Sequence, residues 1–422
     1  MEFWQGTFAP TAISVAVLLG VASVVGRRLP IPSSILAGVL GLIAGPGVLG
    51  WLPLDTASLE VGVYHALAVV FICIGLQRPA QDRSRGEARA MAFGISTMVA
   101  MQTCIGLALA LLMGVHAGFG LLLPLGFEQG PGQAMSLGAA WESAGLVDGA
   151  QVGLIVAAIG FGWSVFAGVP LVIAGRRLGW ETLASAEPAD DEVGEAVAPE
   201  SLTSALALLA AVYAVTWATC SALSGLLAAM PDIAAMVWGF HFLIGALWAT
   251  AARSLMVRVA PEALPGNGQL AQLSGTTVDL ATVAALSAVQ LAVLGAWWMP
   301  ILAITTAGGL ATLFACVWLA RRGFRSAPFE HAVMWFGMST GTLPVGLALL
   351  RAIDPRLRSP APASAVFGSA LSIPGVAPVI VGLHPLAIAG SPGLALGLCT
   401  AWLCGLLVAW WSVGGLQLRE PA

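Results

Sequence analysis

The sequence predicts an all-α, polytopic membrane protein with about 11 transmembrane helices plus two re-entrant hairpins, arranged as an inverted-topology repeat. Three observations lead to this fold class: the composition, two interrupted apolar segments and the positions of the arginines. Hydrophobic residues make up 58% of the 422 residues, charged residues only 9%, and the mean hydropathy is +0.91. Soluble domains carry roughly 25% charged residues, so lipid must be the solvent for most of this chain.

Eleven apolar stretches have about the length that a membrane-spanning helix needs. They cover residues 9–26, 32–51, 59–77, 90–115, 149–175, 201–229, 233–252, 277–296, 299–320, 361–383 and 392–416. No basic residue precedes the first stretch, which favours a retained helix over a cleaved signal peptide.

Two further apolar segments, residues 119–141 and 330–352, are interrupted by glycine, proline and polar residues. The first contains GFEQGPGQAMSLGAAWE, residues 126–142. Backbone that is not helical is tolerated at membrane depth only where protein or a water-filled cavity covers it. We therefore expect both segments to be re-entrant hairpins.

The arginines predict the orientation, because basic residues concentrate in cytoplasmic loops. Arg27 and Arg28 follow the first span and place the N-terminus outside. Arg176 and Arg177 are then cytoplasmic only if the segment 119–141 enters from the outside and returns to it.

The same reasoning applies to the second interrupted segment. Arg321 and Arg322 precede it on the inside, and Arg351 follows it. Arg351 stays inside only if the segment 330–352 enters from the inside and returns there. The two hairpins are thus expected to dip from opposite sides, and Arg419 places the C-terminus inside.

Opposite hairpins indicate an inverted repeat, and an offset of 211 residues supports it: Gly126 and Gly130 fall on Gly337 and Gly341. This gives four expected regions. They are a first repeat, 1–177, with the outside-entering hairpin; an acidic cytoplasmic linker, 178–200; a second repeat, 201–386, with the inside-entering hairpin; and an additional C-terminal helix, 387–422.

Paired hairpins of this kind are typical of secondary transporters whose site lies near the midplane. A broken helix exposes amides that suit an anion and carbonyls that, with nearby side-chain oxygens, suit a hard cation such as Na⁺. The hairpin tips are expected to meet near the midplane, with one module moving against a more static one.

The candidate site residues follow from this chemistry. For substrate binding they are Gly130, Gly132, Gln133, Ser136, Thr340, Gly341, Thr342 and Arg351. For sodium coupling they are Glu128, Gln129, Asp279 and Ser339, while Gly126 and Gly337 are hairpin glycines. Each has a plainer alternative. The glycines could serve helix packing, the hydroxyls and amides could cap helices, and Glu128 could face outside water. Asp279 could be an interfacial helix-start residue, and Arg351 could simply follow the charge bias.

The residues GFEQGPGQAMSLGAAWE, the residues FGMSTGTLPVGLALLRAID (336–354) and LSGTTVDLATVAALSAVQL (273–291) together resemble the bacterial sodium/glutamate symporter family. The resemblance covers about residues 30–385 and implies sodium-coupled symport of glutamate or a similar small organic anion by alternating access. It implies a multi-pass protein of the bacterial inner membrane and a homodimer as the expected assembly. Two departures stand out: Pro131 and Gln133 flank Gly132 where the family has His and Thr, and the C-terminal helix is extra.

Two rival functions stay open. Residues 28–50 also look like the second span of cation/proton antiporters, although the paired carboxylates or Asn-Asp of those proteins do not occur in a mid-chain span. Gly337–Gly341 matches G-x-S-x-G, so Ser339 with His384 would make an intramembrane serine protease. We expect a carrier and not an enzyme, with the bilayer, Na⁺ and a small anion as partners. No cofactor, nucleic-acid partner or metal beyond transported Na⁺ is expected.

Overall fold

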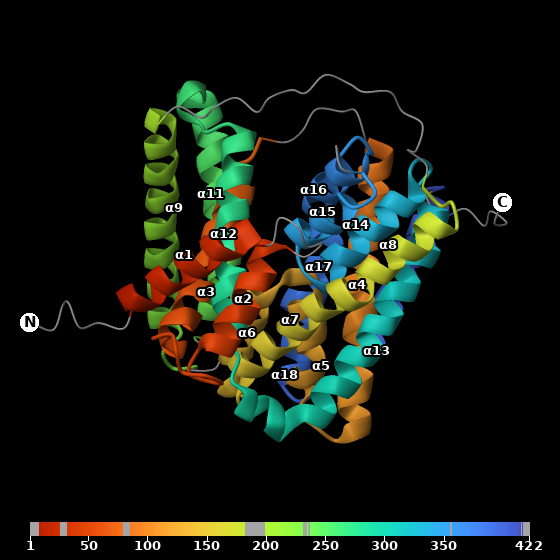
Figure 1. The fold of residues 1–422 in the computed structure, drawn as a ribbon, viewed down its shortest axis with the longest axis horizontal. Coiled ribbons are helices and arrows are strands. Elements are labelled where there is room, and N and C mark those ends of the chain that lie inside the picture. Colours follow the sequence, from red (N-terminus) through yellow and green to blue (C-terminus); the bar gives the residue numbers. More distant parts are fainter. Residues whose placement is uncertain are drawn as a thin grey trace, which may run out of the picture.

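The computed structural model describes residues 8–25, 32–78, 85–181, 199–230, 234, 237–354, 357–414 and 416, and every regular element in these ranges is a helix (Figure 1). Eight of the described helices are long and apolar enough to cross a membrane, or nine if a helix pair bent by 52° is one span. The chain is therefore an all-α, multi-pass membrane protein. Several residues used above lie outside the described residues: Arg27, Arg28, Arg419 and most of the linker, 182–198.

Several expected spans differ from the helices observed, and two of the differences bear on the site. The stretch 32–51 holds only the short helix α2 (Ser33–Ala44), because Gly45 is extended and the proline after it cannot continue a helix. The expected span 277–296 is wrong in position: α12 runs Asn267–Ser287 and α13 starts at Leu291. The apolar pattern continues through the break at 288–290, so hydropathy alone could not reveal it.

Six helices form one side of the molecule, which we call the frame helices (Figure 1). They are α1 (Phe8–Val25), α2, α3 (Thr56–Leu76), α9 (Pro199–Leu226), α11 (His241–Val259) and α12. α3 packs against both α11 and α12, α2 packs against α12, and α9 packs against α11. A short turn, η4 (Pro261–Ala263), joins α11 to α12.

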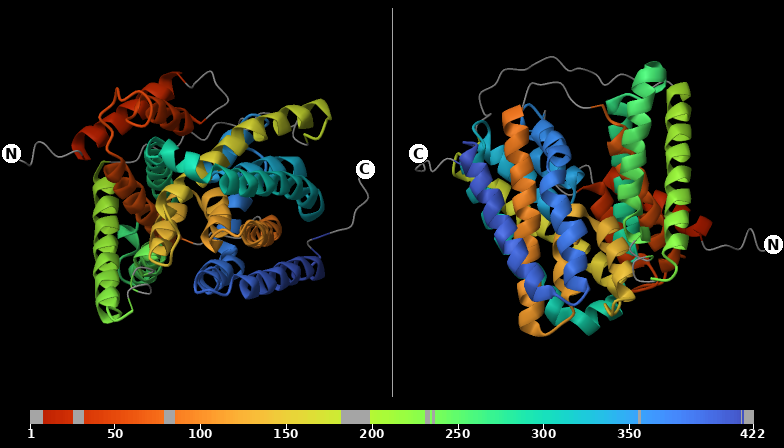
Figure 2. Two further views of the ribbon diagram at one scale, coloured as in Figure 1. Left: turned by 90° about the horizontal axis from the view of Figure 1, so that it is seen from below. Right: turned by 180° about the vertical axis from the view of Figure 1, so that it is seen from behind.

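The remaining helices form the other side and are called the hairpin helices here (Figure 2). In the first half these are α4 (Arg85–Met113), α5 (Ala117–Pro124), the π-helical turn η3 (Leu125–Gln129), α6 (Pro131–Glu142), α7 (Gly149–Phe166) and α8 (Gly168–Arg177). In the second half they are α13 (Leu291–Gly323), α14 (Pro328–Thr340), α15 (Leu343–Leu350), α16 (Ala361–Leu371), α17 (Ile373–Ala377), η5 (Pro378–Leu383), α18 (His384–Ile388) and α19 (Pro392–Ser412). α13 is kinked at Trp297, whose backbone is not helical.

The helix boundaries recur at the offset found in the sequence. Adding 211 to the bounds of α3, 56 and 76, gives 267 and 287, the bounds of α12. The same offset carries the start of α5, residue 117, onto the start of α14, residue 328. The packing recurs as well, since α3 against α11 corresponds to α12 against α2, and α4 against α5 corresponds to α13 against α14.

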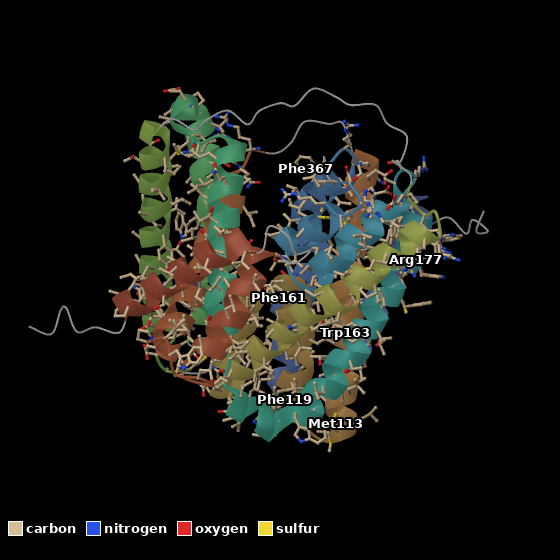
Figure 3. All side chains as sticks on the ribbon, in the orientation of Figure 1. Met113, Phe119, Phe161, Trp163, Arg177 and Phe367 are labelled. Carbon is tan, nitrogen blue, oxygen red and sulfur yellow. The ribbon has the colours of Figure 1, made fainter. Side chains whose placement is uncertain are left out.

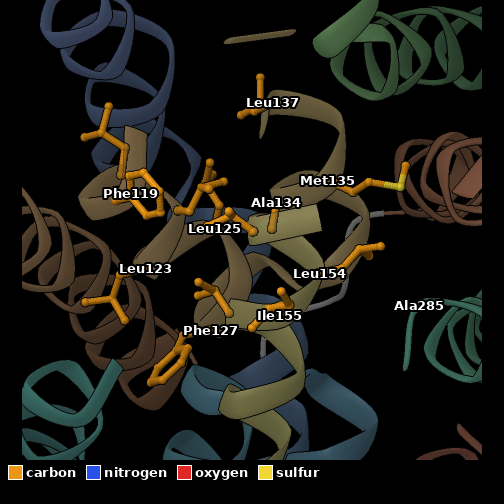
Figure 4. Packing of buried hydrophobic residues seen from close by; sticks show 14 of the residues in the cluster. Phe119, Leu123, Leu125, Phe127, Ala134, Met135, Leu137, Leu154, Ile155 and Ala285 are labelled. Atoms are coloured by element: carbon orange, nitrogen blue, oxygen red, sulfur yellow. The ribbon is translucent and has the colours of Figure 1, made fainter. Parts of the chain in front are cut away.

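The core surrounds the first interrupted segment. Figure 4 shows Leu125, Phe127 and Ala134 packed against Leu154 and Ile155 of α7. The backbones of α5 and α6 also touch those of their neighbours α4 and α7 directly. A Cβ atom on Gly120 would lie 2.2 Å from the Gly106 carbonyl oxygen, and one on Gly138 would lie 2.2 Å from that of Gly149. Small residues thus bring α5 against α4 and α6 against α7 at backbone contact.

Candidate functional site

The first hairpin is made of α5, η3 and α6, and both of its outer ends lie at one end of the molecule. His116, before α5, and Ala144, after α6, are joined by a 3.2 Å hydrogen bond between Nε2 and the carbonyl oxygen. Figure 3 shows Phe119 near Met113, the last residue of α4, at that same end. The two outer ends of the first hairpin therefore lie next to each other.

The tip of this hairpin lies halfway along α7. Gly126 packs on Ala157, and a Cβ on Gly153 would lie 2.4 Å from the carbonyl oxygen of Ala134. Gly130 has a φ of 88°, a conformation that favours glycine, and it ends the π-helical turn. Pro131 follows, which suits the first turn of a helix because its missing N–H would be unpaired there.

The second hairpin consists of α14 and α15, which turn back at Gly341. A Cβ on Gly337 would lie 2.7 Å from the Cα of Gly346, so the two arms are in close contact. At the outer end, the His331 Nε2 lies 2.7 Å from the Ser364 Oγ of α16. The start of α14 and the start of α16, the helix that follows this hairpin, are therefore neighbours.

The two tips meet. A Cβ on Gly130 would lie 3.2 Å from the Thr342 Cγ2 atom. From α7, the Ser164 Oγ is 2.7 Å from the Thr340 Oγ1, and Gly160 abuts the Thr340 carbonyl. Both α6 and α15 begin here, at Gly130 and Thr342, and neither N-terminus has a side-chain cap. The N-termini of two helices without a side-chain cap thus converge on one point, which favours negative charge.

A second set of polar atoms lies behind the two hairpin tips and comes from four residues, Glu128, Ser339, Gln102 and Thr312. The side chain of Glu128 lies beside that of Ser339 on the opposite hairpin. The Gln102 Nε2 of α4 donates to the Ser339 carbonyl oxygen at 3.1 Å and to the Thr312 Oγ1 of α13 at 2.9 Å. Glu128 is 9% exposed and the other three residues are fully buried. Three oxygens in this set have no hydrogen-bond partner among the described residues: Glu128 Oε2, Ser339 Oγ and Gln102 Oε1.

Gln102 and Thr312 were not among the residues expected from the sequence. Gln102 is an amide in the middle of an apolar helix of 29 residues, and polar groups at such positions are costly unless they have a function. That signal could have identified it. Thr312 lies in a helix with many small residues and carries no comparable mark.

Several other predicted residues also lie near the tips. Gln133 donates to the Gln129 Oε1 at 3.1 Å, and its own Oε1 has no described partner. Ser136 is buried one turn further along α6, with its Oγ likewise unpartnered. Gly132 packs on Leu67 of α3, where a Cβ would lie 3.0 Å from the Leu67 Cβ, so this part of the hairpin faces the frame helices.

Three predicted residues are placed elsewhere. Asp279 lies on α12, where its carboxylate meets Ser34 in the first turn of α2. Arg351 is exposed and ends α15, ten residues after Gly341 and so about 15 Å along the helix from the tip. His384 approaches Thr103 of α4, with 3.2 Å between Nε2 and Oγ1, and is not hydrogen-bonded to Ser339 in the described structure.

The described residues contain no cluster of three or more His, Cys, Asp or Glu side chains that could hold a metal ion. What the site offers is a pair of uncapped helix N-termini at the tips and a buried group of oxygens beside them. The fold and this geometry are the only guide to function, because comparison with models of known protein families and with curated proteins finds no match.

Proposed function

We propose that this protein is a secondary active transporter that carries glutamate or a similar small organic anion together with Na⁺ by alternating access. The observation that carries the proposal is the meeting of two interrupted helical hairpins halfway through the bundle, at Gly130 and Thr342. Transporters with this architecture bind substrate where discontinuous helices expose their ends. A structural membrane protein would have no use for two such breaks at one point.

In this proposal the two hairpins are re-entrant loops. The outer ends of the first hairpin are joined by the His116–Ala144 hydrogen bond, and the start of the second is joined through His331 to Ser364 of the following helix α16. The recurrence of helix bounds and packing at an offset of 211 supports an inverted repeat. The central linker and the C-terminus are then cytoplasmic, and the protein belongs to the bacterial inner membrane.

The anion is proposed to bind at the tips. The amides at the starts of α6 and α15 supply partial positive charge, and a small carboxylate could accept hydrogen bonds from them. Gln133 and Thr342 have unpartnered side-chain oxygens nearby that could orient it. The hairpin helices would move together against the frame helices, because the hairpins are bound to α4 and α7 by backbone contacts.

The test is uptake of labelled glutamate by the purified protein in proteoliposomes, with an inward Na⁺ gradient. The expected result is accumulation that stops when choline replaces Na⁺. Uptake that responds only to a pH gradient would contradict the sodium coupling. No uptake of any small carboxylate under either gradient would contradict the proposed function itself.

A further inference from the structure

The group of oxygens behind the hairpin tips has a property that the substrate site does not need. The Glu128 carboxylate is nine-tenths buried, and among the described residues no basic side chain forms a salt bridge with it. An uncompensated carboxylate within a membrane protein is costly, so either a proton or a cation must accompany it. The surrounding atoms decide between these two.

Two of those atoms are oxygens: the Ser339 hydroxyl, which can donate or accept, and the Gln102 amide oxygen, which can only accept. The Gln102 amide has two donors, and both are used, one by Thr312 Oγ1 and one by the Ser339 carbonyl. This fixes the amide and leaves its Oε1 as a free acceptor. A protonated Glu128 would need only one such acceptor, whereas a cation needs several.

We propose that Glu128, Ser339 and Gln102 form the binding site for the coupling cation, and that this cation is monovalent. The single carboxylate balances one positive charge, and two neutral oxygens, Ser339 Oγ and Gln102 Oε1, complete the set contributed by side chains. Hard cations prefer oxygen ligands of this kind. A divalent ion would leave an unbalanced charge in an apolar core.

The placement also explains how cation and anion would be coupled, an inference that rests on the proposed function. The cation ligands come from three elements: Glu128 from the first hairpin, Ser339 from the second and Gln102 from α4. A cation bound among them holds the two hairpins together. Ser339 lies three residues before Thr342, so a bound cation would position the two tips at which the anion is proposed to bind.

Asp279, the other carboxylate considered for coupling, has a different environment. It meets Ser34 at the N-terminus of α2, where the helix dipole stabilises a negative charge. It therefore has a structural partner within the frame helices. Glu128 also lies beside a hydroxyl, that of Ser339, but it does so where the two hairpins meet, which is why the cation is assigned to Glu128.

The test measures cation binding without substrate. The thermal unfolding midpoint of the detergent-purified protein, followed by tryptophan fluorescence, is recorded across concentrations of NaCl, KCl and choline chloride. The wild type should be stabilised by Na⁺ and not by choline. Glu128→Gln should abolish the Na⁺ effect, and Gln102→Leu and Ser339→Ala should each raise the Na⁺ concentration needed by about tenfold or more.

The matched control is Glu142→Gln. Glu142 lies on the same hairpin but is exposed, where its Oε1 accepts from the Ala150 amide at 3.0 Å, and glutamine can keep that bond. This variant should keep the wild-type Na⁺ response. If Glu128→Gln does not fold, Gln102→Leu and Ser339→Ala decide by the same criterion.

Two results would overturn the inference: an unchanged Na⁺ response in these variants, or a wild type that is stabilised by acid but not by Na⁺. The second result would make Glu128 a proton carrier. Glutamate uptake separates this inference from the proposed function. If Glu128→Gln still takes up glutamate with the Na⁺ dependence of the wild type, the cation site is refuted and the proposed function stands. If Glu128→Gln loses Na⁺ binding but the wild type takes up no anion, the proposed function is refuted and the cation site stands.

Discussion

Gln151, in the first turn of α7, donates a hydrogen bond of 2.5 Å to the Glu60 carboxylate of α3. The same amide donates to the Ala288 carbonyl at 3.2 Å and accepts from the Gln290 amide at 3.0 Å. One side chain thus fastens a hairpin helix to a frame helix and to the break between α12 and α13. At the offset of 211 the two positions are Pro362 and Ala271, whose side chains cannot make these hydrogen bonds.

Gln151→Leu should loosen this contact. It leaves a carboxylate, a carbonyl and an amide without their partner, and a buried unpaired polar group costs about 1–3 kcal/mol. We expect a lower unfolding midpoint and faster hydrogen exchange at the Gln290 amide, measured by mass spectrometry. Gln272→Leu, at an exposed position on α12, is the control and should leave that exchange unchanged. Equal exchange in Gln151→Leu and the wild type would show that the fastening is not important.

Gly138→Ala should destabilise the first hairpin. The added methyl group would lie 2.2 Å from the Gly149 carbonyl oxygen, and overpacking of this kind costs about 1–3 kcal/mol. Gly162→Ala on α7 is the matched control, because the added Cβ would lie 3.9 Å from Phe166 Cδ2, an ordinary van der Waals contact. The unfolding midpoint should fall for the first variant and not for the second. A similar midpoint for both would mean that α6 and α7 can separate without loss.

Ser164→Ala should weaken substrate binding more than it weakens the fold. The hydroxyl is 2.7 Å from Thr340 Oγ1 and holds the second tip against α7. Losing one such bond costs about 0.5–1.5 kcal/mol, or roughly a two- to tenfold rise in the KM for uptake. Ser143→Ala is the control, since Ser143 bonds only to the Ala140 carbonyl at the outer end of the hairpin. A KM for Ser164→Ala equal to that of the control would contradict a role for the tip.

Replacing Pro131 by His and Gln133 by Thr together should change the choice of substrate. These residues start α6 beside the uncapped amides, and Gln133 is tied to Gln129. Thr is too short to keep that bond, so Gln129 would be freed to contact the substrate. Competition of unlabelled dicarboxylates and amino acids against glutamate uptake measures the change. An inhibition profile identical to that of the wild type would place the selectivity elsewhere.

The all-helical membrane architecture and the two interrupted segments could be predicted from hydropathy, glycine and proline. The hairpins expected at 119–141 and 330–352 lie at residues 117–142 and 328–350, because glycine and proline mark their tips and apolar runs mark their arms. The span expected at 277–296 was misplaced because the sequence stays apolar across the break. What ends α12 is a hydrogen-bonding arrangement with Gln151, which comes from a distant part of the chain.

The site was harder to predict than the fold. Glu128 and Ser339 belong to the hairpins, so their meeting follows once the hairpins are recognised. Gln102 comes from a continuous helix, and its role depends on which face of α4 is turned toward Ser339. Arg351 shows the opposite case: its sequence position close to the hairpin suggested the substrate, but eight residues of helix carry it to the exposed end.

In the proposed transport cycle, the glycine contacts described above also decide at which interfaces helices would move past each other. Where backbone contacts backbone, as between Gly120 and Gly106 or between Gly138 and Gly149, no side chains separate the two helices. Where α6 meets α3, the side chain of Leu67 lies between them, and Gly132 presents a smooth face to it. In the proposed transport cycle, the glycines at backbone contact would keep the hairpin helices together, and Gly132 would leave the contact with Leu67 as the place where α6 moves past α3.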